Sequence, residues 1–227
     1  MIQTILSACL VLLFAIPLYA SKGKQIDRLE EAAEVLSEIM KIPEGSIPKD
    51  LLEKAECVAI IPSMKKAAVG IGGNYGRGCI VCRLQKGWSP PVMVSMTGAS
   101  FGLQLGGTST DVVLLVMNKR GISKLLESKV TLGADASAAA GPKGRTAAAA
   151  TDAQMRAEIL CYARSRGLFA GVSLGGSVLK PEPDDNEDLY GRKIDTHQLL
   201  LKGGKIPSAA ERLIDLLTEY SPRGKEQ

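Results

Sequence analysis

Short apolar runs interrupted by glycine and proline fill the middle of this chain, and they restrict its fold more than any other feature. Runs rich in Val, Ile and Leu, bounded by turn residues, predict β-strands. We expect strands at residues 58–61, 67–71, 79–84, 92–96, 101–105, 112–117, 129–134, 158–163 and 168–179. Because no helical pattern alternates regularly with these runs, an antiparallel sheet or a barrel-like core is favoured over a doubly wound sheet.

Helical patterns flank this β-rich segment. Apolar residues recur at three- and four-residue steps over 24–41, and acidic residues cover the opposite face. A short second helix is expected from Pro48 to Glu56, where Pro occupies a favourable early position. A last helix is expected over 207–220. Residues 181–188 are expected to form a polar acidic loop, and Arg166-Gly167 a hairpin turn. The sequence therefore predicts a single α+β domain with a β-rich core at about residues 57–180.

The first twenty residues have the layout of a secretory signal. An apolar run from Ile5 to Ile16 is followed by Pro17, by Ala20 and then by charged residues. The run is short for a membrane span, which needs about 20 apolar residues. We expect cleavage after Ala20, a mature domain at 21–227, and an exported protein that is periplasmic or secreted. An uncleaved anchor and lipidation at Cys9 are the alternatives.

Four cysteines lie outside this leader: Cys57, Cys79, Cys82 and Cys161. An even number in an exported chain permits disulfides, although a chain of this length does not require them. Cys79 and Cys82 have the spacing of a metal knuckle, but no second pair and no nearby histidine completes a zinc site. Residues three apart on a strand face opposite ways, so we expect buried free thiols here and no metal.

Charge is distributed unevenly along the chain. Lys and Arg number 15 against 5 Asp and Glu over residues 57–180, whereas the flanks are acidic, with 6 against 9 over 21–56 and 7 against 10 over 181–227. A basic core can hold an anionic surface, since each basic residue near an anionic bilayer contributes roughly 1 kcal/mol. An ordinary solvated surface is the alternative. Aromatic residues make up only 4% of the chain, which argues against stacking-based binding of single-stranded nucleic acid.

The glycine-rich stretch from Gly70 to Gly78 does not match a nucleotide-binding loop. The third glycine of a dinucleotide fingerprint would fall on Tyr75, and the run that follows is strand-like. Close strand packing or a hairpin turn is the better explanation.

Catalytic groups are scarce. The single histidine, His197, follows Asp195, but no nucleophile elbow of the GxSxG type accompanies it, so a surface or helix-start histidine is favoured. Asp111 and Asp135 each lie beside an apolar run, where turn and capping roles are expected. We predict no catalysis and no cofactor.

Six blocks in order carry a family resemblance: Gly70–Gly78, Ser95–Gln104, Ser109–Asn118, Leu132–Ser137, Ala140–Arg145 and Ser165–Leu174. Together they resemble the SYLF domain, a lipid-binding family, over about residues 26–220. The resemblance implies a compact β-rich domain that binds phospholipids, including phosphoinositides in eukaryotic members. Some fungal members also bind actin, usually beside SH3-type or FYVE modules, which these residues do not include. Actin would not meet an exported chain, so lipid binding carries over more readily.

The leading hypothesis is an exported module that binds anionic phospholipid surfaces through its basic core. The expected headgroup contacts are the cations of that core: Lys65, Lys66, Arg77, Arg83, Lys143, Arg145, Arg164 and Arg166. Arginine adds bidentate phosphate bonding to charge attraction. The family blocks include Arg77, Arg145 and Arg166 of this set. An envelope structural or assembly protein that binds another protein through the same face is the first alternative, and a hydrolase using His197 is the second.

Overall fold

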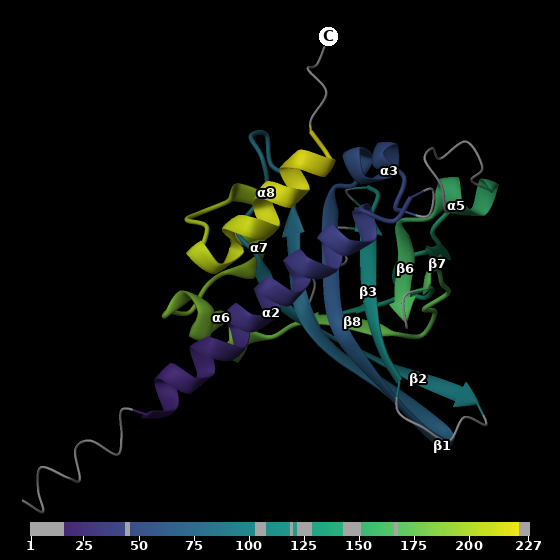
Figure 1. Cartoon of the computed structure of the whole chain (residues 1–227), viewed down its shortest axis with the longest axis horizontal. Coiled ribbons are helices and arrows are strands. Elements are labelled where there is room, and N and C mark those ends of the chain that lie inside the picture. Colours follow the sequence, from purple (N-terminus) through teal and green to yellow (C-terminus); the bar gives the residue numbers. More distant parts are fainter. Residues whose placement is uncertain are drawn as a thin grey trace, which may run out of the picture.

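The protein is described here from a computed structural model, covering residues 16–43, 46–102, 108–118, 120–121, 129–142, 151–165 and 168–222. One curled sheet forms its centre, with helices on one face and beside one edge (Figure 1). The strands are β1 (Cys57–Cys82), β2 (Val92–Gly102), β3 (Thr108–Val116), β4 (Val130–Thr131), β5 (Ala138–Ala140), β6 (Ile159–Ser165), β7 (Leu168–Gly171) and β8 (Val178–Pro181).

These strands join in the order β4-β8-β2-β1-β3-β6-β5, and β7 pairs with β6. Every pairing is antiparallel except that between β5 and β6. The predicted α+β class with an antiparallel, barrel-like core is therefore confirmed.

β1 folds back on itself. A straight strand of 26 residues would span about 85 Å, yet the Cα atoms of Cys57 and Cys82 lie 4.0 Å apart. The first leg pairs with β3 and the second with β2, over Gly70–Ile80. The turn predicted within Gly70–Gly78 is therefore wrong, because those residues are paired strand. Close packing explains Gly78 instead, since a Cβ there would lie 1.9 Å from the carbonyl oxygen of Ile60.

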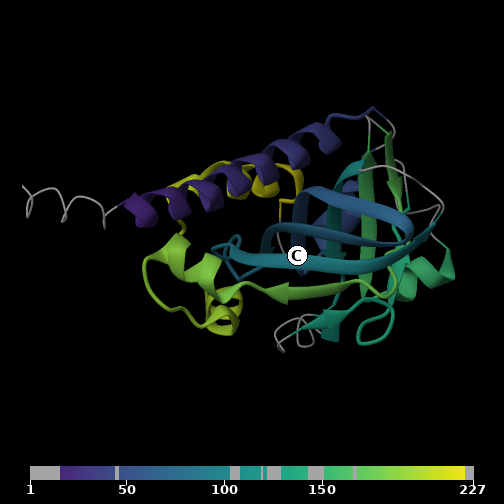
Figure 2. The ribbon, with the colours of Figure 1, turned by 90° about the horizontal axis from the view of Figure 1, so that it is seen from below.

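The helices are α2 (Ile16–Met40), α3 (Lys49–Lys54), α5 (Asp152–Arg156), α6 (Pro183–Tyr190), α7 (Thr196–Lys202), the 3-10 turn η2 (Ser208–Ala210) and α8 (Glu211–Tyr220). Figure 2 shows α2 lying along one face of the sheet with α8 beside it. Buried Leu29, Ala33 and Leu36 line the inner side of α2, as the three- and four-residue spacing predicted. None of the described helices is long and apolar enough to cross a membrane.

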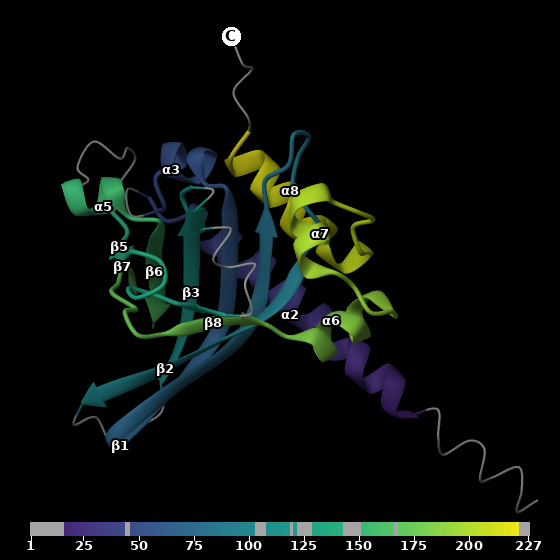
Figure 3. The same ribbon diagram turned by 180° about the vertical axis from the view of Figure 1, so that it is seen from behind.

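The sheet buries both of its faces. Alternate residues of β1, such as Cys79 and Val81, pack under the helices, whereas Ile80 and Cys82 pack on the opposite side. Figure 3 shows β8 crossing that opposite side. This two-sided burial explains why the strands appear in the sequence as continuous apolar runs rather than as alternating ones.

Three predicted elements differ from the observed ones. The acidic loop at 181–188 is largely helix α6, because Pro183 and acidic residues suit a first helical turn and Gly191 ends the helix in the left-handed conformation. The strand predicted over 168–179 is two strands, β7 and β8, which pair with different partners. α2 starts at Ile16 and runs through Ala20, so cleavage after Ala20 stays a prediction.

The prediction of buried free thiols at Cys79 and Cys82 is correct for Cys79 and wrong for Cys82, and Cys161 is also a buried free thiol. Cys82 forms a disulfide with Cys57 at the base of β1. The pairing follows from the fold-back of β1, which brings together two residues that are 25 positions apart. Cys79 faces the other side of the strand, as its three-residue spacing from Cys82 predicted.

Candidate functional site

A bulge in the first leg of β1 opens a groove beneath α2. Pairing with β3 shifts register between Ile61 and Met64, where Pro62 has no backbone N–H for the ladder and Ser63 has a φ of 49°. The carboxylate of Asp111 on β3 accepts a hydrogen bond of 2.9 Å from the Ser63 backbone N–H. This bond holds the bulge in place, which is the backbone-capping role predicted for Asp111.

Two adjoining hollows lie along α2 and share Glu31, Pro62 and Ser63. We call them together the α2–β1 groove. Its acidic half, of about 450 Å³, is lined by Glu31, Glu34, Glu38, Asp111 and Arg164 among others. Its basic half, of about 400 Å³, is lined by Lys24, Arg28, Lys65, Tyr75 and Arg77, together with Asp27 and Glu31. The groove thus changes sign along its length.

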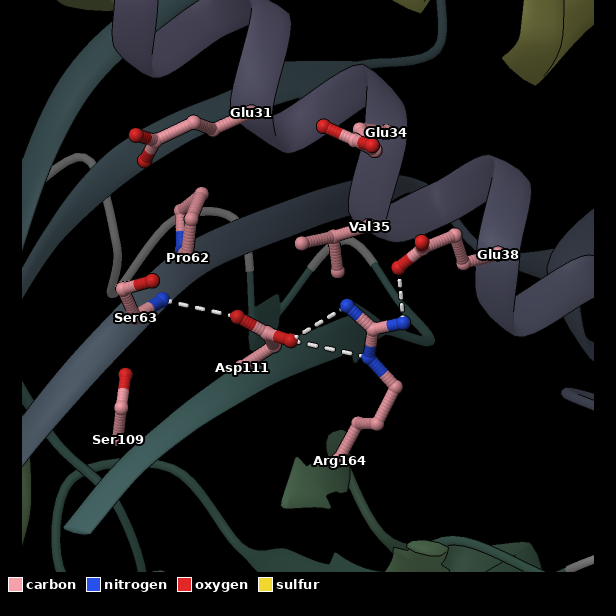
Figure 4. A pocket seen from close by; sticks show the side chains of 9 residues that line it. All are labelled: Glu31, Glu34, Val35, Glu38, Pro62, Ser63, Ser109, Asp111 and Arg164. Carbon is pink, nitrogen blue, oxygen red and sulfur yellow. Dashed lines mark hydrogen bonds and ion pairs between the residues drawn. The ribbon is translucent and has the colours of Figure 1, made fainter. Parts of the chain in front are cut away.

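In the acidic half, Arg164 is already occupied. Its Nε and Nη2 donate to Asp111 Oδ2 over 2.9 and 2.8 Å, and its Nη1 donates to Glu38 of α2 (Figure 4). Burial lowers the pKa of Arg164, but its bonds to Asp111 and Glu38 outweigh burial and raise that pKa overall. Arg164 therefore ties β6, β3 and α2 together, and an incoming phosphate would have to displace two carboxylates.

The basic half contains open cations. Lys65 is exposed and makes no ion pair with any described residue. Arg77 is also exposed, and its Nε donates to the hydroxyl oxygen of Tyr75, a bond that is the main cause of its raised pKa. Arg77 lies 3.7 Å from Asp185 of α6, whose closer partner is Arg28 at 2.6 Å. Arg28 is thus neutralised, while Lys65 is exposed and the Arg77 side chain is 43% exposed beside its longer ion pair with Asp185.

The other predicted cations have different positions. Arg83 donates to the carbonyl oxygens of Leu52, Ala55 and Ser221, and its guanidinium lies 4.2 Å from the centre of the Trp88 ring. It is a structural clamp between the ends of α3 and α8. Lys66 is half-buried opposite Thr108 in the pairing of β1 with β3. The remaining three, Lys143, Arg145 and Arg166, lie outside the described residues.

Sequence reasoning missed three residues of the basic half, Lys24, Arg28 and Tyr75. Lys24 only marked the start of a predicted helix, and Tyr75 was treated as an interruption of a glycine pattern. Tyr75 is 45% exposed, an unusual position for a tyrosine in a paired strand, and Arg77 lies over its ring at 5.8 Å. The Tyr-Gly-Arg spacing was the available signal, because residues two apart on a strand share a face.

The described residues offer little for catalysis. His197 is exposed in the first turn of α7, where Asp195 caps the helix by accepting from Gln198, and it lines neither half of the groove. No three His, Cys, Asp or Glu residues within the described ranges are arranged to hold a metal ion. Burial raises the pKa values of Cys79 and Cys161 to about 12, so these thiols are poor nucleophiles at neutral pH.

Comparison with known proteins gives the family. Residues 97–220 match the model of the family described as Las17-binding protein actin regulator, Ysc84. The chain is 34% identical over 197 residues to protein YSC84 of Saccharomyces cerevisiae, covering 83% of this chain and 42% of that protein. It is 31% identical over 201 residues to the human SH3 domain-containing YSC84-like protein 1, covering 86% and 58% respectively. The chain belongs to the Ysc84/SYLF family.

A third relative, an SH3 domain-containing protein of Schizosaccharomyces pombe, is 38% identical over 175 residues, or 75% of this chain and 40% of that protein. The chain therefore spans about two fifths to three fifths of the length of these Ysc84/SYLF relatives. The family description, a Las17-binding protein and actin regulator, and the name of another Saccharomyces cerevisiae relative, LAS seventeen-binding protein 3, refer to binding and regulation rather than to an enzymatic activity.

Proposed function

We propose that this Ysc84/SYLF domain is a non-catalytic module that binds anionic phospholipid surfaces through the basic half of the α2–β1 groove. The observation that carries the proposal is the exposure of Lys65 and Arg77 on one face of β1, with Lys24 of α2 beside them. Lys65 makes no ion pair with any described residue and Arg77 makes only a longer one, of 3.7 Å to Asp185, so both retain attraction for phosphate, whereas Arg83 and Arg164 are each held by several protein oxygens.

The acidic ridge of α2 limits which part of the molecule faces an anionic membrane. Asp27, Glu30, Glu31, Glu34 and Glu38 are all exposed along this helix. An anionic bilayer repels them, and Asp27 and Glu31 line the basic half as well, so the lipid would approach from the β1 side of the groove, where Lys65 and Arg77 lie. Of the predicted headgroup contacts that lie among the described residues, Lys65, Arg77 and the half-buried Lys66 therefore remain as candidates.

Co-sedimentation with vesicles tests this proposal. The protein is compared at low and high salt on vesicles of neutral lipid alone and of neutral lipid containing phosphatidylserine. Binding that requires phosphatidylserine and weakens with salt is expected, because salt screens exposed charges over about 10 Å at 0.1 M. Absence of binding to either vesicle would overturn the proposal.

A matched pair of variants locates the surface. Lys65→Glu with Arg77→Gln is expected to weaken binding by roughly a hundredfold, because three units of charge are lost at about 1 kcal/mol each. Lys193→Glu with Lys205→Gln makes the same total charge change at two exposed residues near α7 and is expected to leave binding within about threefold. Equal losses in both variants would indicate attraction to net charge rather than to this face.

A protein partner is the second candidate, because the names of the relatives refer to Las17 binding and to actin regulation. Such a partner would use the same basic face. A pull-down with the immobilised domain, from extract with and without its lipids, separates the two candidates. A protein that binds the domain directly would still be captured after the lipids are removed, whereas one held through lipid would not.

Export is proposed with this function. The apolar run before residue 20 supports it, and the Cys57–Cys82 disulfide supports it as well, because such bonds persist in oxidising compartments. N-terminal sequencing of protein purified from its native source tests the proposal. A sequence starting at Ser21 is expected, and an intact Met1 in a cytosolic fraction would overturn it.

A further inference from the structure

A hollow of about 860 Å³ lies between α6, α7 and the start of α8, and we call it the C-terminal pocket. Its lining comes from residues 189–211. Figures 1 and 3 show α7 between α6 and α8 beside the sheet. The pocket is larger than either half of the α2–β1 groove and shares no lining residue with it. Its volume falls within the range of about 300–1,000 Å³ that is usual for small-molecule sites.

Cations line this pocket, although the C-terminal flank of the chain is acidic. Residues 192–205 include four Lys and Arg and one Asp. Arg192 and Lys193 follow α6 and Lys205 follows α7, and all three line the pocket and are exposed. None of the three makes an ion pair with a residue in the described part of the chain. They are therefore available to an anionic ligand.

Two carboxylates also line the pocket, and each has a role in a helix. Asp195 Oδ1 accepts a hydrogen bond of 3.1 Å from the Gln198 backbone N–H and so caps α7. Glu211 lies in the first turn of α8, where the helix dipole favours a negative charge. Positive charge remains in excess among the lining residues.

Apolar side chains form another part of the lining. Leu189 and Ile206 pack against the core beneath α2, and Leu199 packs against the core on the opposite face of the sheet. Ile194 is also half-buried in the pocket, but it belongs to neither core among the described residues. Its side chain is therefore available to cover an apolar part of a ligand.

We propose that the C-terminal pocket binds a small organic anion, a carboxylate or phosphate ester with an apolar body. Arg192, Lys193 and Lys205 hold the anionic group by charge-assisted hydrogen bonds, and Ile194 contacts the apolar body. An apolar wall with a few converging polar groups is the usual composition of a small-molecule site. The inference is independent of the proposed phospholipid function, because the predicted headgroup contacts lie in the α2–β1 groove.

Fluorescence titration with anilinonaphthalene sulfonate tests the pocket. This dye is an organic anion with an apolar body, and its emission rises in apolar surroundings. Saturable binding at one site is expected. The neutral analogue phenyl-naphthylamine lacks the sulfonate and is expected to bind this site at least about tenfold more weakly, because it loses the charge-assisted bonds. Equal binding of the two dyes would overturn the proposal.

A matched pair of variants locates the dye. Lys193→Glu with Lys205→Gln is expected to weaken its binding at least about tenfold. Lys49→Glu with Lys54→Gln makes the same charge change at exposed positions of α3 and is expected to leave binding within about twofold. Equal losses would mean attraction to net charge and would refute the site. The vesicle experiment reports separately on the groove, so either site can fail while the other stands.

Two single substitutions test the chemistry of the ligand. Glu211→Gln removes a repulsive charge and is expected to tighten dye binding about twofold to fivefold. Weaker binding of this variant would indicate a ligand that also needs a carboxylate partner, and would contradict the assignment to anions. Ile194→Ser is expected to weaken binding about threefold or more while the melting temperature changes little. Unchanged binding would show that the apolar body does not contact Ile194.

Competition identifies the source of the anion. Phenyl phosphate and octanoate are each titrated against the bound dye. Displacement by phenyl phosphate points to a soluble phosphate ester, and displacement by octanoate points to a single-chain lipid. Displacement by neither would mean an adventitious dye site only and would overturn the proposal.

Discussion

At its base, β1 is held by the Cys57–Cys82 disulfide and by Arg83, which reaches three carbonyl oxygens and the Trp88 ring. At its neck, the same strand presents Lys65, Tyr75 and Arg77 in exposed positions. The two regions are similar in sequence, since both combine cations with an aromatic residue close by. They differ in what the cations already contact. A local density of cations is therefore a better guide to a candidate surface where the cations stay exposed, as Lys65 and Arg77 do, than where three protein carbonyl oxygens hold the cation, as with Arg83.

The largest difference in stability between variants of the base and variants of the neck is expected for glycine substitutions. Gly78→Ala places a Cβ 1.9 Å from the Ile60 carbonyl oxygen, and we expect a loss of about 3 kcal/mol in the free energy of unfolding. Gly73→Ala has its nearest contact at 3.8 Å and is expected to change stability by less than about 1 kcal/mol. Urea denaturation of both variants measures the difference. Equal losses would show that the neck packs as tightly as the base.

Reduction of the Cys57–Cys82 disulfide is the next largest effect. The bond closes a loop across a separation of 25 residues, and its loss is expected to cost up to about 3 kcal/mol. Urea denaturation with and without reductant measures this cost. The variant Cys57→Ala with Cys82→Ala is the control, since reductant should leave its stability unchanged. If the fully reduced protein were as stable as the oxidised protein, the two legs of β1 would not need the disulfide to stay together.

Two arginine substitutions should separate stability from binding. Arg83→Met removes the donor for three carbonyl groups and is expected to cost about 2 kcal/mol of stability without weakening vesicle binding of the folded protein. Arg77→Met at the neck is expected to cost less than about 1 kcal/mol and to weaken vesicle binding several-fold. Thermal unfolding and co-sedimentation are measured on both. A reversal of the two patterns would contradict the assignment of the two regions.

The smallest expected effect concerns the buried thiols. Burial raises the pKa of Cys79 and of Cys161 from 9.0 to about 12, whereas the unfolded thiols ionise near the ordinary value. The stabilisation is complete below pH 9 and is lost as pH rises from 9 toward 12, because only the unfolded chain releases these protons in that window. In the native protein at pH 8, iodoacetamide should modify neither thiol, and it should modify the exposed control Ser208→Cys rapidly. Fast modification of Cys79 or Cys161 would show that the sheet opens around that thiol.

Much of the fold was accessible from local patterns. The inner face of α2 follows from the three- and four-residue spacing of apolar residues, because burial of one helix face imposes a period. The strands β3 and β6 follow from continuous apolar runs, because both faces of the sheet are buried there. Helix α6 was missed, since its sequence is polar and acidic with only Leu189 partly buried against the core. The first-turn signals Pro183 and Asp184 were present, but a charged segment without apolar period was interpreted as a loop.

The candidate site was accessible only in part. Lys65 and Arg77 were predicted from cation density and lie together in the groove. Arg83 and Arg164 were predicted on the same argument, but both are engaged within the fold. Their partners, among them Ser221 and Glu38, lie more than 100 residues away in the chain. No local pattern reveals such an approach.

The sequence by itself determined the β-rich class, the basic core between acidic flanks, and the uncharged stretches at 67–76 and 87–110, because period and charge are properties of the chain before it folds. Only the tertiary structure decided which cysteines pair, which arginines are already bonded, and which residues meet at the neck of β1. Those outcomes depend on where β1 folds back and on how α2 crosses it. Both depend on packing between segments that are distant in the sequence. The free energy of that packing is not a sum of contributions from residues that are neighbours in the sequence.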